Sequence, residues 1–205
     1  MRLRWSPTSP FVRKVMVLIK EKGIEHLIEK EKSNPLSRED RAATPNPLGK
    51  IPCLVTDDGM AIYDSPVIVE YLDATCDGPK LLAASGPERW TALRRAALAD
   101  GMMDASVACF VESIRKPERQ SAGWMAHNKA NVFKAIASLE GEVAAFGKDP
   151  DVGQIGIAVA ISFAEDTFPD EDWRSASPAL AKWFDGFSAR PSMTETRLIP
   201  ANEFK

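Results

Sequence analysis

The sequence predicts an α/β N-terminal domain followed by an all-α C-terminal domain, and three observations lead to this prediction. Short apolar runs alternate with helical patterns up to about residue 78. Beyond residue 87 the apolar residues recur mostly at helical spacing, and no convincing strand pattern follows. A turn-rich linker separates the two regions. We therefore expect domains at residues 1–78 and 88–205.

The N-terminal domain is expected to begin with a strand, a helix and a second strand. The first strand is predicted at residues 3–5, and Ser9-Pro10 then marks a helix start, because Ser caps free N–H groups and Pro fits the first turn. Gly23 suits the end of this helix. The second strand is predicted at residues 24–28, parallel to the first and joined to it by a right-handed crossover.

A hairpin and a helix are expected to complete this domain. The polar residues 29–45 predict one helical turn near residues 37–42. Strands at residues 53–55 and 60–63 are joined through Asp57-Asp58-Gly59. Ser65 as N-cap and Pro66 then open a helix that runs to residue 74. The order β-α-β followed by β-β-α is the thioredoxin-like pattern with a mixed sheet.

The C-terminal domain is predicted to consist of four main helices. Their breaks are Lys116-Pro117, Gly147 and Pro191, and the predicted ranges are 88–114, 121–146, 152–164 and 178–190. Asp151 and Gln154 fit a capping box before the third of these helices. Ser177-Pro178 fits the start of the fourth.

Composition and charge exclude several classes of protein. The 205 residues carry a net charge of −3 with a pI near 5.5, so no basic excess is available to bind nucleic acid. The N-terminus lacks the apolar core of a signal peptide, and the apolar run at residues 15–19 is too short to span a membrane. Three distant cysteines cannot form a complete disulfide framework. We expect a cytoplasmic protein with reduced thiols and no membrane partner.

The segment from Asn46 to Ser65 gathers groups that could bind a small peptide. Pro52 belongs at a strand start because it has no N–H. A cis Ile51-Pro52 bond costs only about 0.5–1 kcal/mol over trans and would turn the Ile51 N–H and C=O outward. Amides at the Ser65 helix start favour an anion, and Asp64 would suit an ammonium. Together these groups describe a site for a γ-glutamyl tripeptide, although a plain hairpin and capped helix with a trans proline fit the same residues.

The motif Asn-Pro-Leu-Gly-Lys-Ile-Pro at residues 46–52, with Asp64-Ser65 before a helix, resembles the glutathione-binding half of the glutathione S-transferase superfamily. The resemblance implies the glutathione transferase fold, a homodimer and glutathione as co-substrate. By match, Ile51 before cis-Pro52 pairs with the cysteinyl part of glutathione, and Asp64-Ser65 hold its γ-glutamyl end. The family more often has Glu at the acidic position, and Asp64 is one methylene shorter.

Two basic residues are further candidates for glutathione binding. Lys50 precedes Ile51-Pro52 and could reach the glycyl carboxylate of glutathione. Arg38, in the polar segment, could do the same on weaker grounds. For Lys50 an ordinary solvated lysine is the alternative.

Ser9 is the candidate catalytic residue, at the place where related transferases carry Tyr, Ser or Cys. A thiol with a pKa near 8.5 is mostly protonated at neutral pH. A hydroxyl that donates a hydrogen bond to the thiolate, beside the positive end of a helix, favours ionisation. Ser9 could instead serve only as a helix cap, and Ser6 and Thr8 are neighbouring alternatives. No Cys precedes Cys53, so dithiol chemistry is not expected, and Cys53 is predicted to be a core residue.

The helical domain offers weaker candidates. Asp100 could reach across a dimer interface to the γ-glutamyl amine, although a surface position is the better alternative. Met102, Met103 and Phe110 could line an acceptor pocket or belong to the core.

The sequence thus predicts a glutathione transferase that conjugates the glutathione thiolate to a small electrophile, as in detoxification. The alternatives are a non-catalytic interaction module of the same fold and a glutathione-dependent isomerase or lyase. The isomerase branch has a Ser-Ser-Cys-type loop followed by Arg, which Ser6-Pro7-Thr8-Ser9 and Arg13 match poorly. No metal-ligand cluster is evident in the sequence.

Overall fold

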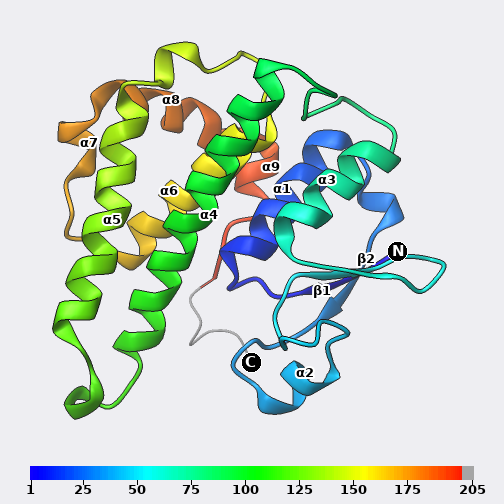
Figure 1. Ribbon diagram of the computed structural model, residues 1–205, viewed down its shortest axis with the longest axis horizontal. Coiled ribbons are helices and arrows are strands. Elements are labelled where there is room, and N and C mark those ends of the chain that lie inside the picture. Colours follow the sequence, from blue (N-terminus) through cyan, green and yellow to red (C-terminus); the bar gives the residue numbers. More distant parts are fainter. Residues whose placement is uncertain (200–205) are drawn as a thin grey trace. The chain divides into compact units, whose positions relative to one another are not determined.

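The computed structural model describes residues 1–199, which form two compact units (Figure 1). The first contains residues 1–89 together with 191–199, and the second contains residues 90–190. The division predicted from the sequence, at 1–78 and 88–205, remains a prediction about domains, and its last six residues lie outside the described part. Each unit is described by itself below.

The first unit is built on a mixed sheet with the strand order β2-β1-β3-β4. β1 (Arg2–Trp5) pairs in parallel with β2 (Glu29–Lys32) and antiparallel with β3 (Cys53–Val55), which pairs antiparallel with β4 (Ala61–Ile62). The helices α1 (Pro10–Lys22) and α3 (Ser65–Thr75) pack against each other, and α3 also contacts β3. The thioredoxin-like order with a mixed sheet, predicted from the sequence, is confirmed.

Apolar side chains between the sheet and these two helices form the core of the first unit. Fully buried members from β1, β3, α1 and α3 include Leu3, Leu54, Val15, Leu18, Ile68 and Leu72. A short helix, α2 (Arg38–Ala43), begins at Ser37, whose Oγ accepts a hydrogen bond from the Asp40 N–H at 3.2 Å. The helical turn expected at residues 37–42 is therefore confirmed.

The second strand was predicted at residues 24–28, and this prediction is wrong. Gly23 ends α1 in the left-handed conformation at φ 68°, and the Ile24 N–H bonds back to the Ile19 carbonyl at 3.1 Å. The 3₁₀ turn η1 (Glu25–Leu27) uses the next residues. The strand therefore starts only at Glu29, and it consists of the exposed residues Glu-Lys-Glu-Lys. Because β2 is an edge strand held by backbone pairing with β1, it carries no apolar alternation to reveal it.

The two helix starts predicted from Ser-Pro pairs in the first unit differ in the structure. Ser9 caps α1 as expected, because its Oγ accepts from the Val12 N–H at 3.3 Å. Ser65 is not the N-cap of α3, because the Ile68 N–H already bonds the Asp64 carbonyl at 3.0 Å and the helix begins at Ser65. The N-cap is Asp64, whose side chain makes no capping hydrogen bond.

Helices make up the second unit. Its main helices are α4 (Pro87–Ser113, which begins in the first unit), α5 (Ala122–Glu140), α6 (Val152–Thr167) and α8 (Pro178–Ser188). Shorter turns are η2 (Pro117–Arg119), η3 (Val143–Ala145) and α7 (Trp173–Ala176), and α9 (Pro191–Thr194) belongs to the first unit. The second predicted helix was too long, since α5 stops at Glu140 and η3 follows. α7 and α9 were not predicted.

Local and distant groups both cap the helices of the second unit. The capping box is confirmed: Asp151 Oδ1 accepts from the Gln154 N–H at 2.8 Å, and Gln154 Oε1 accepts from the Asp151 N–H at 3.0 Å. Ser177 occupies the N-cap position of α8, but its side chain makes no capping bond. The Glu140 carboxylate at the end of α5 accepts from the backbone N–H groups of Ala179 and Leu180 instead, at 3.1 and 2.8 Å.

Within residues 1–199, none of the helices combines the length and the apolar character that a membrane span requires.

Candidate functional site

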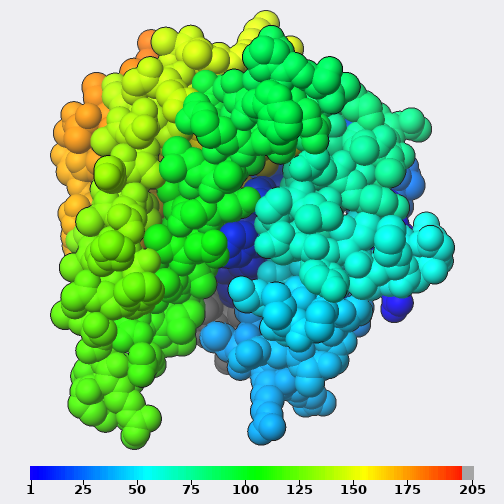
Figure 2. Space-filling model, viewed as in Figure 1, coloured from blue at the N-terminus to red at the C-terminus, as the bar shows by residue number. Residues whose placement is uncertain are grey.

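The strand register brings three separate segments of the first unit to one edge of its sheet. Arg4 pairs with Cys53 across β1 and β3, and Leu54 pairs with Ile62 across β3 and β4. The segment that follows β1, the segment that precedes β3 and the segment that follows β4 therefore meet at the same end of the strands. These segments carry Ser9, Ile51-Pro52 and Asp64-Ser65. Figure 2 shows the dark-blue surface of the N-terminal residues beside the cyan surface of the segment around residues 60–75.

Two helices begin at this edge, and their N-terminal amides are satisfied differently. Ser9 caps α1, as described above. In α3, Pro66 has no N–H, and the amides of Ser65 and Val67 have no hydrogen-bond partner within the described residues. Free amides at the positive end of a helix favour an anionic ligand. The start of α3 can therefore receive a carboxylate.

Three hydroxyl groups lie in the loop between β1 and α1. The Ser6 and Thr8 hydroxyls are hydrogen-bonded to each other at 3.0 Å, so one of them uses its proton on the other. Among the described residues, Ser9 Oγ accepts a hydrogen bond from the Val12 N–H and donates none. A hydroxyl has one proton to donate as well as lone pairs, so Ser9 can cap α1 and still donate to a ligand. This arrangement favours Ser9 over Ser6 and Thr8 as the hydroxyl that can donate to a ligand.

The Ile51-Pro52 bond is cis, as the glutathione-binding interpretation expected. The peptide bond between Tyr63 and Asp64 is also cis, which nothing in the sequence predicted. Pro52 is buried and Ile51 is half-buried, whereas Lys50 and Asp64 are exposed at the same edge.

Arg38 is exposed near the start of α2, and no hydrogen bond or ion pair joins it to these residues within the described chain. The structure therefore brings Lys50 to the candidate site and gives no such support for Arg38.

Cys53 is completely buried in β3, as expected of a core residue. Burial raises the pKa of its thiol, and the nearby backbone of Asn46 only partly opposes this rise. A buried thiol with a raised pKa is a poor nucleophile.

The remaining candidates lie on α4 in the second unit. Met102 and Met103 are buried in the core of that unit, which agrees with the core alternative for them. Asp100 and Phe110 are partly exposed, and their predicted roles at a dimer interface and an acceptor pocket stay predictions.

Sequence reasoning missed the side chain of Asn46. It is buried, it accepts a hydrogen bond from the Leu48 N–H at 3.0 Å, and its Nδ2 donates to the Lys50 carbonyl at 3.2 Å. The signal in the sequence was its position as the first residue of a turn that leads to Ile51. Among residues 1–199 no group of His, Cys, Asp and Glu is arranged to hold a metal ion.

Comparison with known proteins identifies the family. Residues 8–75 match the model of the glutathione S-transferase N-terminal domain, and residues 122–186 match the model of the C-terminal domain. The chain is 32% identical to the uncharacterized GST-like protein YibF of Escherichia coli, over 96% of this chain and 98% of that protein. It is 28% identical to a maleylacetoacetate isomerase of Pseudomonas aeruginosa, over 77% of this chain and 74% of the relative.

A solved structure gives a closer likeness. A glutathione transferase family member from Pseudomonas fluorescens, crystallised with bound S-(propanoic acid)-glutathione, is 40% identical over 98% of this chain and 100% of its own, with a TM-score of 0.89. The candidate site lies in the segment matched by the N-terminal domain model. On these matches, and with the thioredoxin-like and helical parts both present, the chain belongs to the glutathione S-transferase superfamily.

Proposed function

We propose that this protein is a glutathione transferase that binds glutathione at the sheet edge formed by Ser9, Ile51 and Asp64-Ser65. The observation that carries the proposal is the register of β1, β3 and β4, which brings these three segments together from distant parts of the chain. The family and a 40% identical relative crystallised with a glutathione derivative support it.

Each part of glutathione finds a chemically matched group at this edge. The free amides of Ser65 and Val67 suit the γ-glutamyl carboxylate, and the exposed carboxylate of Asp64 suits the γ-glutamyl ammonium. The backbone of Ile51 pairs with the cysteinyl part, as one strand pairs with another. Lys50 lies next to Ile51 in the chain, where its ammonium can attract the glycyl carboxylate.

The chemistry begins with the thiol of the bound glutathione. Loss of the thiol proton to solvent leaves a thiolate, which accepts a hydrogen bond from the Ser9 hydroxyl beside the N-terminus of α1. The thiolate then forms a carbon–sulfur bond with the electrophile, whose leaving group departs or whose double bond takes up the electron pair. Ser9 stabilises the charge and does not itself attack, and holding the two reactants in place provides the rest of the rate.

We further propose a cytoplasmic homodimer. Three buried free cysteines fit a reducing compartment. Large exposed apolar side chains such as Val67 on α3 and Trp90 on α4 offer surface for a second copy. Light scattering at micromolar concentration should give twice the 22.5 kDa chain mass, and a clean monomer would contradict the dimer.

The isomerase relative gives a second candidate function. A glutathione-dependent isomerase uses the same bound thiolate but returns glutathione after each turnover. Assaying a panel of electrophiles together with a cis-alkene substrate separates the two, because conjugation consumes free thiol and isomerisation does not. Glutathione binding without turnover of any substrate would favour the non-catalytic interaction module.

The binding test uses calorimetry with glutathione on matched variants. Asp64→Asn changes the site, whereas Asp58→Asn makes the same charge change in the β3–β4 turn, at the opposite end of these strands. A hydrogen bond to a charged group contributes roughly 1.5–3 kcal/mol, so Asp64→Asn should weaken binding about ten- to a hundredfold. Asp58→Asn should bind like the parent. No binding by the parent, or equal affinity for Asp64→Asn and Asp58→Asn, would refute this assignment.

A further inference from the structure

The loop before Ile51 is a tight turn organised around Asn46. The Gly49 N–H bonds the Asn46 carbonyl at 2.8 Å, with Pro47 at the second position and Gly49 at φ 64°. Asn, Pro and Gly at these positions are typical of a type I turn. A Cβ on Gly49 would lie 3.2 Å from the Arg41 carbonyl oxygen, so the turn packs closely on the end of α2.

The side chain of Asn46 lies inside this turn, with only 2% of its surface exposed. Its Oδ1 accepts from the Leu48 N–H at 3.0 Å, and its Nδ2 donates to the Lys50 carbonyl at 3.2 Å. If the side-chain amide were flipped, Nδ2 would face the Leu48 N–H and Oδ1 would face the Lys50 carbonyl oxygen. Both contacts would be repulsive, so the surroundings fix the orientation of the amide. The side chain of Asn46 is therefore held by the backbone of Leu48 and of Lys50 at once.

The bond from Asn46 to the Lys50 carbonyl also fixes the direction of the next backbone group, the Ile51 N–H. The carbonyl of Lys50 and the N–H of Ile51 belong to the same peptide unit, which is planar and trans. In a trans peptide the C=O and the N–H point in opposite directions. Holding the carbonyl against buried Asn46 therefore aims the Ile51 N–H away from the turn.

We propose that Asn46 is a positioning residue for glutathione, because it fixes the direction of the Ile51 N–H that pairs with the cysteinyl part of the ligand. The inference rests on the proposed function. Without the Nδ2 donor, the Lys50–Ile51 peptide plane can rotate, and an amide aimed in several directions binds a ligand backbone less well. Asn46 does not touch glutathione itself and acts only through this peptide unit.

Asn46→Asp is the sharpest test, because it has nearly the same shape and keeps the acceptor for the Leu48 N–H but loses the Nδ2 donor. Asn34→Asp is the matched control: Asn34 Oδ1 accepts from the Leu36 N–H at 3.0 Å in the same kind of turn, away from Ile51 in the chain. Asn46→Ser is a second variant, whose shorter hydroxyl still suits a turn. Glutathione affinity is measured by calorimetry, and protection of the Ile51 amide from hydrogen exchange by NMR.

Both Asn46 variants should bind glutathione about tenfold more weakly than the parent, as expected for the loss of one neutral hydrogen bond that leaves a partner unpaired. In the parent, glutathione should slow exchange of the Ile51 amide, and in the variants this protection should be reduced at equal ligand occupancy. Asn34→Asp should behave as the parent in both measurements. A merely structural role would lower the stability of the Asn46 variants and leave the protection at equal occupancy unchanged.

The outcomes separate the two hypotheses. A parent that does not bind glutathione refutes the proposed function, and the inference falls with it. A parent that binds, with Asn46 variants within about twofold of its affinity, overturns the inference alone. If the Asn46 variants do not fold, hydrogen exchange in the parent tests the inference. If glutathione does not slow exchange of the Ile51 amide in the parent, the inference is overturned.

Discussion

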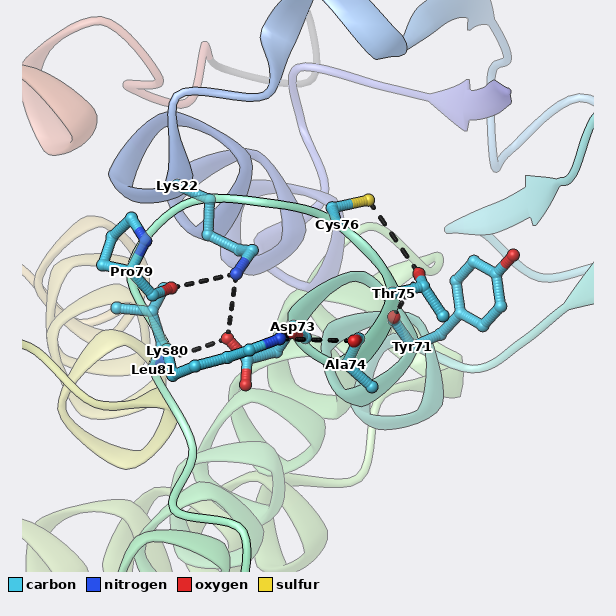
Figure 3. A network of polar contacts seen from close by, with 9 residues as sticks. All are labelled: Lys22, Tyr71, Asp73, Ala74, Thr75, Cys76, Pro79, Lys80 and Leu81. Carbon is cyan, nitrogen blue, oxygen red and sulfur yellow. Dashed lines mark hydrogen bonds and ion pairs between the residues drawn. The ribbon is translucent and has the colours of Figure 1, made fainter.

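Breaking the buried ion pair between Lys22 and Asp73 should strongly destabilise the first unit. Figure 3 shows the pair, in which Lys22 Nζ at the end of α1 lies 3.2 Å from Asp73 Oδ1 on α3 and also donates to the Pro79 carbonyl at 2.9 Å. The Lys22 side chain is fully buried and that of Asp73 is 6% exposed. The same Asp73 oxygen accepts from the Leu81 N–H at 2.8 Å. One carboxylate thus joins two helices to the segment that follows α3.

The contacts of Asp73 determine how large the loss of stability should be. Asp73→Asn keeps an oxygen for the Leu81 N–H and removes only the negative charge, which leaves the ammonium of Lys22 buried without its counter-ion. Removing one partner of a buried pair costs about 3–5 kcal/mol, and we expect the lower end because Lys22 keeps the Pro79 carbonyl. For a chain of this size each kcal/mol lowers Tm by roughly 2–4 °C. Asp73→Asn should therefore lower Tm by at least about 6 °C.

Urea unfolding of four proteins tests this reasoning. The first is Asp73→Asn. The second is the double variant Lys22→Met/Asp73→Asn, which removes both charges and should recover most of the loss. The third is Glu70→Gln on the same helix, which breaks the partly exposed pair with Arg89 and should cost at most about 1 kcal/mol. The fourth is the parent. A loss below about 1 kcal/mol for Asp73→Asn, or a double variant that is no more stable than the single one, would refute the account of this pair.

Two further predictions concern stability. Gly78→Ala should destabilise the protein by more than about 1 kcal/mol, because Gly78 has φ +97° and a Cβ there would lie 2.4 Å from the Lys22 carbonyl oxygen. Gly141→Ala is the control in thermal unfolding, because the nearest atom to a Cβ there lies at 3.6 Å. Equal losses of stability in the two variants would contradict the prediction. Hydrogen bonding to Arg94, and to a lesser degree Arg95, holds the pKa of Glu142 below its ordinary value near 4.5. Between the folded and unfolded pKa values the unfolded chain binds more protons, so this contribution is present above pH 4.5 and is lost as pH falls through the folded pKa. As the pH is lowered below 4.5, the free energy of unfolding should therefore fall less steeply for Glu142→Gln than for the parent. If the free energy of unfolding had the same pH dependence in both proteins, the ion pair would contribute nothing.

The parts of the fold that depend on neighbouring residues could be predicted from the sequence. Ser9 caps α1 and Asp151 pairs with Gln154, because each motif is complete within four residues. The hairpin around Gly59 follows from its turn residues and has φ +91° at this glycine. The glutathione-binding motif was recognised for the same reason, since its members lie close together in the chain.

The features that depend on distant residues could not be predicted. The strand at residues 29–32 is defined only by pairing with β1, and its four charged residues give no apolar signal. Glu140 caps α8 from a position 39 and 40 residues away from the amides that it accepts. The cis bond before Asp64 likewise leaves no pattern in residue type or spacing.

The central claim is that the Ser9 hydroxyl stabilises the thiolate of bound glutathione, and the pKa of the bound thiol tests it most directly. The ultraviolet absorption of the thiolate, followed against pH at saturating glutathione, gives this pKa without the need for an electrophile. In the parent it should lie below the free value near 8.5. A hydrogen bond to a charged group contributes roughly 1.5–3 kcal/mol, so Ser9→Ala should raise the pKa of the bound thiol by about 1–2 units.

The control for this measurement is Ser121→Ala, because Ser121 caps α5 as Ser9 caps α1, with its Oγ accepting from the Trp124 N–H at 3.3 Å. Loss of that cap should leave the thiol pKa unchanged, which separates thiolate stabilisation from helix capping. The account predicts a lowered thiol pKa in the parent and in Ser121→Ala, and a rise in Ser9→Ala alone. A bound thiol that titrates at the same pH in the parent and in Ser9→Ala would contradict it and leave Ser9 as a helix cap only.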